Sequence, residues 1–113
     1  MTDVLNLGEF EQLVLFAVLR LHDASGLAIH DEIEVRTRRD VSPGAIYTTL
    51  GRLEQRGLVR SEALTAQPGQ VGRPRKRYTL RPSGARALRA AYDNLHAMAG
   101  GQLNKLSEIA KGS

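Results

Sequence analysis

The chain has 113 residues, no cysteine and a formal net charge of +4; 42% of its residues are hydrophobic and 4% are aromatic. This is the size of one compact domain with an aliphatic core, and the lack of cysteine excludes disulfide bonds and thiolate zinc sites. No apolar run reaches the roughly 18 residues that a membrane-spanning helix needs, and the acidic, polar start is unlike a secretory signal. We therefore expect a cytoplasmic protein that does not contact a membrane.

Positive charge is concentrated in one part of the chain. No acidic residue occurs between Ala63 and Tyr92, and most of the acidic residues precede this segment. Its basic residues are Arg73, Arg75, Lys76, Arg77, Arg81, Arg86 and Arg89. A one-sided basic segment in a small domain favours a polyanionic partner such as nucleic acid. On charge alone, a solvated face is an equally good interpretation.

The first predicted helix extends from Gly8 to His22, where apolar residues recur at helical spacing. Part of the helix is apolar on a second face as well, which indicates burial on two sides. The second face consists of Leu15, Phe16 and Leu19. We expect it to be covered either by a partner subunit or by later helices of the same chain.

Two further helices are predicted after a turn at Asp23–Gly26. The second helix covers Ala28–Arg38 and has a charged outer face. The third has the clearest start signal, because Ser42 can accept a hydrogen bond from a free helical N–H and Pro43 suits the first helical position. This helix extends to about Arg56 and stops at Gly57. Its buried stripe is predicted to be Ile46, Leu50 and Leu53.

A β-hairpin with a basic loop follows the third helix. The strands are predicted over Leu58–Leu64 and Lys76–Leu80, with turn residues at Gln67-Pro68-Gly69-Gln70 between them. The loop also carries Gly72-Arg73-Pro74-Arg75, and Pro82 then opens a long last helix. A mainly α protein with a small two-stranded β-wing follows, that is, a winged helix-turn-helix.

The last helix carries an apolar seam in alternating four- and three-residue steps, which is typical of a helix–helix interface. Its members are Leu88, Tyr92, Leu95, Ala99, Gln102, Leu106 and Ile109. We interpret the seam, with the second face of the first helix, as a dimer interface; packing on the chain's own core is the alternative. Gly100-Gly101 interrupts it, since each glycine costs about 1 kcal/mol in a helix interior. A second short helix over Gln102–Lys111 is then an option. We expect a DNA-binding domain over residues 1–81 and a dimerisation helix over residues 82–113.

The side of the third helix opposite its buried stripe is small and polar, which suits the major groove of double-stranded DNA. That groove admits one α-helix, and small side chains let the helix approach the base edges. The helix N-terminus can hold a phosphate, and the wing can follow the backbone or enter a minor groove. The candidate DNA-binding residues are Ser42, Pro43, Gly44, Ala45, Tyr47, Thr48, Thr49 and Arg52 in the helix and Arg73, Arg75, Lys76 and Arg77 in the wing.

Two segments resemble the PadR family of bacterial transcriptional regulators. They are D-V-S-P-G-A-I-Y-T-T-L-G-R-L-E-Q-R-G-L-V, Asp40–Val59, and G-R-P-R-K-R-Y-T-L-R-P-S-G, Gly72–Gly84. The opening L-G-E-F-E-Q-L-V-L-F-A-V-L is also similar. The resemblance implies a dimeric repressor that binds near a promoter palindrome and dimerises through its first and last helices.

Carried over by position, the resemblance places the recognition helix at Ser42–Arg56 and the wing tip at Gly72–Arg77. It implies DNA contacts by Tyr47, Thr48 and Thr49. Gly51 stands where many relatives carry a basic residue, which argues against a phosphate contact at that position. Some relatives bind flat aromatic ligands between paired tryptophans; this chain has none. A cavity lined by leucine and phenylalanine remains an option for a small hydrophobic effector.

Enzyme chemistry is not expected. His22, His30 and His96 lie in different elements, none with a second ligand at metal spacing. The sequence has no GxSxG, no phosphate-binding loop and no paired carboxylates in an apolar setting, so we expect no cofactor. The alternative function is a winged helix that binds an acidic protein partner.

Overall fold

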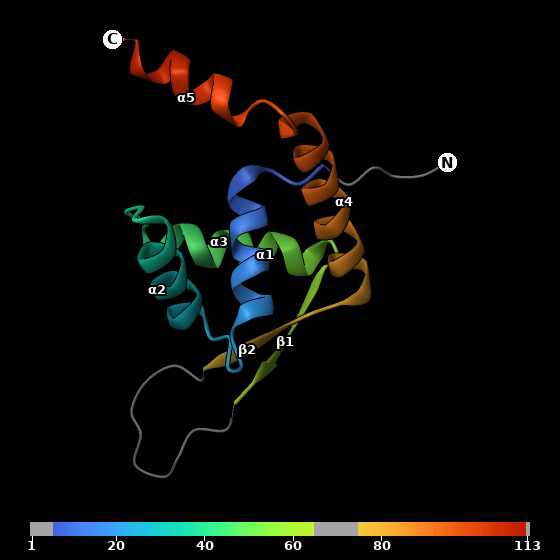
Figure 1. The fold of residues 1–113 in the computed structure, drawn as a ribbon. Helices are drawn as coiled ribbons and strands as arrows, with labels where there is room; N and C mark the ends of the chain where they lie inside the picture. The colour runs from blue at the N-terminus through green and yellow to red at the C-terminus, as the bar shows by residue number, and fades with distance from the viewer. Residues whose placement is uncertain (1–5, 65–74, 113) are drawn as a thin grey trace.

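The computed structural model describes residues 6–64 and 75–112. The elements in chain order are α1 (Glu9–Arg20), α2 (Gly26–Thr37), α3 (Pro43–Gln55), β1 (Val59–Ala63), β2 (Lys76–Leu80), α4 (Pro82–Ala99) and α5 (Leu103–Lys111). In Figure 1, α1 crosses in front of α3, α2 and α4 lie on either side of α1, and the hairpin projects from one end. This mainly helical fold with a two-stranded antiparallel sheet confirms the predicted fold class.

The core is built from aliphatic side chains of α1, α2, α3 and β1, as the composition predicts. The predicted stripe of α3 is confirmed, because Ile46, Leu50 and Leu53 are fully buried. Both faces of α1 are covered at Leu15, which is also fully buried. The expectation that a partner subunit covers Leu15 is therefore wrong, since the helices of the same chain enclose it. The core residues are Val14, Leu15, Ala17, Val18, Ala24, Ile29, Ile33, Val41, Ile46, Leu50, Leu53, Leu58, Val59, Tyr78 and Leu88.

The ends of α3 follow the chemistry read from the sequence. The Ser42 hydroxyl accepts a hydrogen bond from the Ala45 N–H at 3.1 Å, and Pro43 begins the helix. Gly57 has φ of +75°, a left-handed conformation that glycine adopts without strain. The Leu58 N–H then reaches back to the Leu53 carbonyl at 3.0 Å, and the Gly57 N–H to that of Glu54. These two bonds form a Schellman motif, which closes the helix sharply.

The hairpin is attached to the helices at its base. Val59 pairs with Leu80 and Ala63 with Lys76 in antiparallel register. The Tyr78 N–H donates to the Ala24 carbonyl at 2.9 Å, and Ser25 forms an isolated bridge to Arg77. The connection between α1 and α2 thus acts as a third, very short strand, which fixes the base of the wing.

Helix α2 begins earlier than predicted because its N-cap is Ser25. The Ser25 hydroxyl accepts from the Ala28 N–H at 3.2 Å, so Gly26 is already helical and the predicted turn is shorter. At the other end of the chain, the predicted break is confirmed: α4 ends at Ala99 and Gly101 has φ of +78°. Helix α5 has no buried residue. In the described parts of the chain, no helix is long and apolar enough to cross a membrane.

Gly84 tests the packing of α4 on the rest of the domain. A Cβ at this position would run into the carbonyl oxygen of Leu58, which already accepts the Arg81 N–H. We expect Gly84→Ala to lower the free energy of unfolding by about 1–3 kcal/mol, the usual cost of overpacking. Urea denaturation measures this change. The matched control is Gly51→Ala, where a Cβ meets nothing within 4 Å and should stabilise the helix by up to about 1 kcal/mol. Equal effects of both changes would contradict the packing described.

Candidate nucleic-acid interface

The exposed side of α3 carries small and polar side chains, as the sequence predicts. Gly44, Thr48 and Arg52 are exposed, and Tyr47 is 53% exposed. Thr49 is only 5% exposed, because it lies three residues after Ile46 and four before Leu53 on the core side. A DNA contact by the Thr49 side chain is therefore ruled out in this fold, and that prediction is corrected.

The start of α3 is exposed at Ser42, Pro43 and Gly44, while Ala45 is half-buried. Ser42 and Pro43 shape this turn and face solvent. The Ala45 N–H is already engaged by the Ser42 hydroxyl and carbonyl oxygens, both at 3.1 Å. Ser42 and Pro43 thus hold the helix start in place and leave Gly44 at the outer surface.

Tyr47 links α3 to the N-terminus of α2. Its ring rests against Gly26, where a Cβ would collide with the ring carbons and the hydroxyl oxygen. Only glycine allows this close approach of the two helices. The Tyr47 hydroxyl therefore lies beside the first turn of α2, next to the Ser25 cap.

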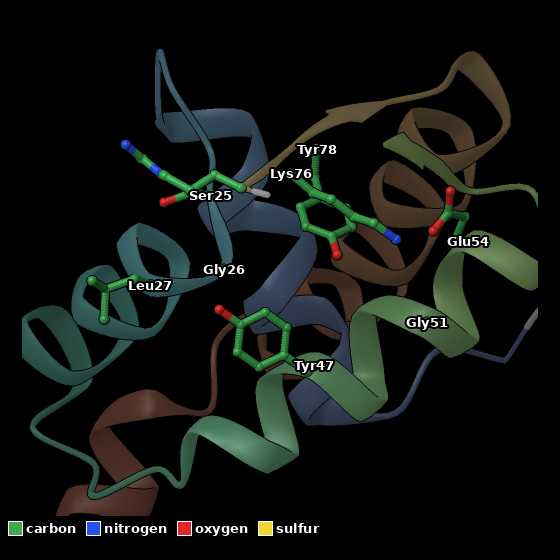
Figure 2. A pocket seen from close by; sticks show the side chains of 9 residues that line it. Ser25, Gly26, Leu27, Tyr47, Gly51, Glu54, Lys76 and Tyr78 are labelled. Carbon is green, nitrogen blue, oxygen red and sulfur yellow. The ribbon is translucent and has the colours of Figure 1, made fainter. Parts of the chain in front are cut away.

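A hollow of about 780 Å³ separates α3 from the wing; we call it the α3–wing hollow. Figure 2 shows Tyr47 on α3 and Tyr78 on β2 on opposite sides of it, with Glu54 farther along α3. Its lining residues are Ser25, Gly26, Leu27, Tyr47, Gly51, Glu54, Arg75, Lys76 and Tyr78. Of these, only Tyr47, Arg75 and Lys76 were predicted as site residues. Ser25 could have been found from its capping pattern, whereas Glu54 and Tyr78 have no local signal.

The hollow has an acidic floor and a basic rim. The Glu54 carboxylate is half-buried and accepts a hydrogen bond from the Ser61 hydroxyl at 2.7 Å. Burial, together with the nearby Glu54 charge, raises the pKa of Tyr78, so its hydroxyl stays protonated. Arg75 and Lys76 are exposed at the rim. The cations thus face outwards, where a polyanion would meet them.

The wing residues divide between two faces of β2. Lys76 lies on the same face as Tyr78 and lines the α3–wing hollow. Arg77 points the other way, with its Nε at 3.9 Å from carboxylate oxygens of both Asp23 and Glu62. Arg75 is more exposed, and its Nη2 lies 3.9 Å from Asp23. Arg73, also predicted to contact DNA, lies outside the described residues.

The predicted dimer residues are only partly at the surface. Leu15 and Leu88 are buried in the chain's own core, which is the alternative interpretation of the seam. Leu19 and Leu95 are 60% and 65% exposed, and Leu106 and Tyr92 are also exposed, while Ala99 is half-buried. Phe16 packs edge-on against Tyr92 at 6.4 Å, and Tyr92 stacks on His96. The exposed residues Leu19, Tyr92, Leu95 and Leu106 form an apolar strip along α1, α4 and α5.

A groove of about 290 Å³ lies along this strip between α1 and α4. Its lining is mostly apolar: Phe16, Leu19, Leu80, Ala85, Leu88, Arg89 and Tyr92. Among the described residues, no group of three or more histidine, aspartate or glutamate side chains could hold a metal ion.

A capped helix with one open polar side, followed by a basic antiparallel hairpin, defines a winged helix-turn-helix protein. The chain belongs to the PadR-like family of transcriptional regulators, whose family model matches residues 15–90. This membership confirms the resemblance seen in the sequence. It also agrees with the expectation that the chain is a regulator and has no enzymatic activity. Among curated proteins, none matches the chain significantly.

Solved structures share the fold. A PadR family transcription regulator from hypervirulent Clostridium difficile is 21% identical, with a TM-score of 0.71 over 88% of this chain and 99% of the other. hsRosR-S1, solved as a complex, is 22% identical, with a TM-score of 0.69 over 97% and 91% of the two chains. A PadR-like regulator from Bacillus cereus is 21% identical, with a TM-score of 0.66 over 86% and 89%.

The contact between Tyr47 and Gly26 can be tested by a double-mutant cycle. Gly26→Ala should lower the free energy of unfolding by about 1–3 kcal/mol, because the new methyl group displaces the tyrosine ring. In a Tyr47→Ala background the same change should cost little, since the ring is gone. Urea denaturation of the four proteins gives the coupling. Gly44→Ala, with open space around its Cβ, is the control. If Gly26→Ala lowers the free energy of unfolding equally in the Tyr47→Ala background, the loss of stability arises from another contact.

Proposed function

We propose that this protein is a homodimeric, sequence-specific DNA-binding regulator that represses transcription at a promoter palindrome. The observation that carries the proposal is the joint exposure of the polar side of α3 and the basic rim of the α3–wing hollow. Family membership supports a role in transcriptional regulation. In this proposal residues 1–81 bind DNA and residues 82–113 mediate dimerisation.

The exposed side chains of α3 are available for contacts with bases, whereas its buried side chains hold the helix on the core. Thr48 and Arg52 are exposed, one turn apart on the same side, and Gly44 and Gly51 beside them leave room for close approach. An arginine can donate two hydrogen bonds to a guanine edge, each such pair contributing roughly 1–3 kcal/mol of discrimination. We assign Thr48 and Arg52 to base contacts in the major groove.

The α3–wing hollow suits the sugar–phosphate backbone that passes between the major and minor grooves. On one side it offers the Tyr47 hydroxyl and the N-terminus of α2, whose partial positive charge favours phosphate. On the other side it offers Lys76 and Arg75. The carboxylate of Glu54 stays on the floor, tied to Ser61, so the phosphate binds at the rim and not inside. Phosphate contacts of this kind fix the register of the protein on DNA.

Repression at a palindrome requires two recognition helices at a fixed separation, about one helical turn or 34 Å of DNA. The exposed apolar strip on α1, α4 and α5 supports a dimer that would provide this spacing. The groove between Phe16, Leu19 and Tyr92 would suit a small hydrophobic effector that changes the spacing. Release by such a ligand is part of the proposal.

Salt dependence separates DNA binding from binding of an acidic protein. We expect mobility shifts of DNA upstream of the protein's own gene to weaken by about 10³–10⁵ in affinity between 50 and 200 mM salt, given about 6–10 phosphate contacts. Arg52→Ala should relax sequence preference, and Lys76→Ala should weaken all sequences evenly and lower the salt slope by about one unit. The control is Arg36→Ala, whose side chain pairs with Glu32 on α2. Sequence-blind, salt-insensitive binding would favour the protein-interaction function.

Leu95 tests the dimer without disturbing the fold, because its side chain is already exposed within one chain. We expect Leu95→Asp to give monomers by sedimentation, since an interface cannot bury an unpaired carboxylate without a large cost. Binding to a two-fold DNA site should be lost with the dimer. Val35→Asp, an exposed apolar position on α2, is the control. A Leu95→Asp protein that stays dimeric would move the interface away from α4.

A further inference from the structure

One histidine of α2 contacts the turn between α2 and α3. His30, on α2, has a side chain that is only 15% exposed. Its Nδ1 is 3.0 Å from the Asp31 carboxylate and its Nε2 is 2.7 Å from the Val41 carbonyl oxygen. A second carboxylate, that of Glu34, is 3.4 Å from the same Nε2. The ring thus joins α2 to the residue that leads the chain into α3.

Val41 is held by α2 at both of its backbone polar groups. Its N–H donates to the Glu34 carboxylate at 3.1 Å, and its carbonyl faces the His30 ring. Because Val41 precedes the N-cap Ser42, neither group belongs to the hydrogen-bond ladder of α3. The Val41 side chain is buried in the core. Residues one helical turn apart on α2 therefore set the position from which the recognition helix starts.

The number of protons on His30 decides how many of these bonds can form. An imidazolium donates from both nitrogens, so it satisfies the Asp31 carboxylate and the Val41 carbonyl together. A neutral ring has one N–H, which leaves one of the two acceptors facing a nitrogen lone pair. The bond to Asp31, then the bond to Val41, and the charge of Glu34 raise the pKa of His30 above its usual 6.5, against the opposing effect of burial.

The turn between α2 and α3 carries three further charged side chains, of which Arg38 and Asp40 are exposed and form no ion pair among the described residues. Arg39 reaches across to Glu9 of α1 at 2.9 Å, and Arg36 pairs with Glu32. The first turn of α3, residues 43–46, carries no charged side chain. In the described part of the chain, no arginine or lysine forms an ion pair with Asp31 or Glu34. Both carboxylates therefore act on His30.

We propose that His30 is a positioning residue for the recognition helix, and that loss of its proton loosens the turn and weakens DNA binding. The folded state favours the charged ring, so the turn is fully stabilised below the unfolded pKa, near 6.5. The stabilisation is lost as the pH rises through the higher folded value. The loosening of the turn concerns the protein alone; only the weakening of DNA binding rests on the proposed function.

The test follows the His30 proton, the Val41 amide and DNA binding over the same pH range. NMR titration gives the His30 midpoint, and hydrogen exchange corrected for intrinsic rates gives the protection of the Val41 N–H. We expect this protection to fall with the His30 midpoint in the parent protein. Asp31→Asn, at a position exposed to solvent, should move the midpoint and the loss of protection to lower pH together. His30→Gln should remove this pH dependence, because glutamine keeps one neutral donor, whereas the control His22→Gln should retain it.

Affinity for the upstream duplex should decrease over the same range, by about tenfold for each unit by which the His30 pKa differs between bound and free protein. The proposal is overturned if the protection of the Val41 N–H does not change as His30 titrates. It is also overturned if the His30→Gln protein keeps the pH dependence of the parent. If the parent binds no DNA at any pH, the proposed function fails. The NMR and exchange data would still decide whether His30 holds the turn.

Discussion

The burial of one side of α3 is the constraint on which the surface proposed to contact DNA depends. Ile46, Leu50 and Leu53 are anchored in an aliphatic core, which contributes roughly 1.5–3 kcal/mol for each such side chain taken out of water. This anchoring fixes the rotation of the helix about its axis, so that Thr48 and Arg52 point outwards. A rotation of one residue would bury polar groups and expose leucine. The buried apolar side of α3 thus keeps the polar side of the same helix facing outwards.

Opposite charges shape the wing and the hollow beside it. Asp23 and Glu62 hold Arg77 loosely, at 3.9 Å, on the face of β2 turned away from α3. The Glu54 carboxylate accepts a hydrogen bond from Ser61, and Lys76 faces solvent. Exposed ion pairs at such distances contribute little to stability. These charged groups instead determine where positive and negative charge lie on the surface. The basic groups at the rim of the hollow meet an incoming polyanion before the acidic floor does.

Much of the fold could be predicted because its boundaries are set by local chemistry. The Ser42-Pro43 start, the Gly57 stop, the strand Lys76–Leu80 and the break at Gly100-Gly101 are short-range signals. Thr49 and Leu15 were misplaced because a helical periodicity gives the direction of a side chain but not the width of the buried sector, which depends on the neighbouring helices. The contact of Tyr47 with Gly26 joins positions far apart in sequence, and no local pattern marks it.

Ser25 lies where three elements meet. Its hydroxyl caps α2, its backbone bridges to Arg77 at the base of the wing, and its neighbour Gly26 receives the ring of Tyr47. Helix α3, the start of α2 and the base of the wing therefore meet at one point. In the proposed dimer, α4 would then set the separation of two such units, and the turn held by His30 would set the position of α3 within each.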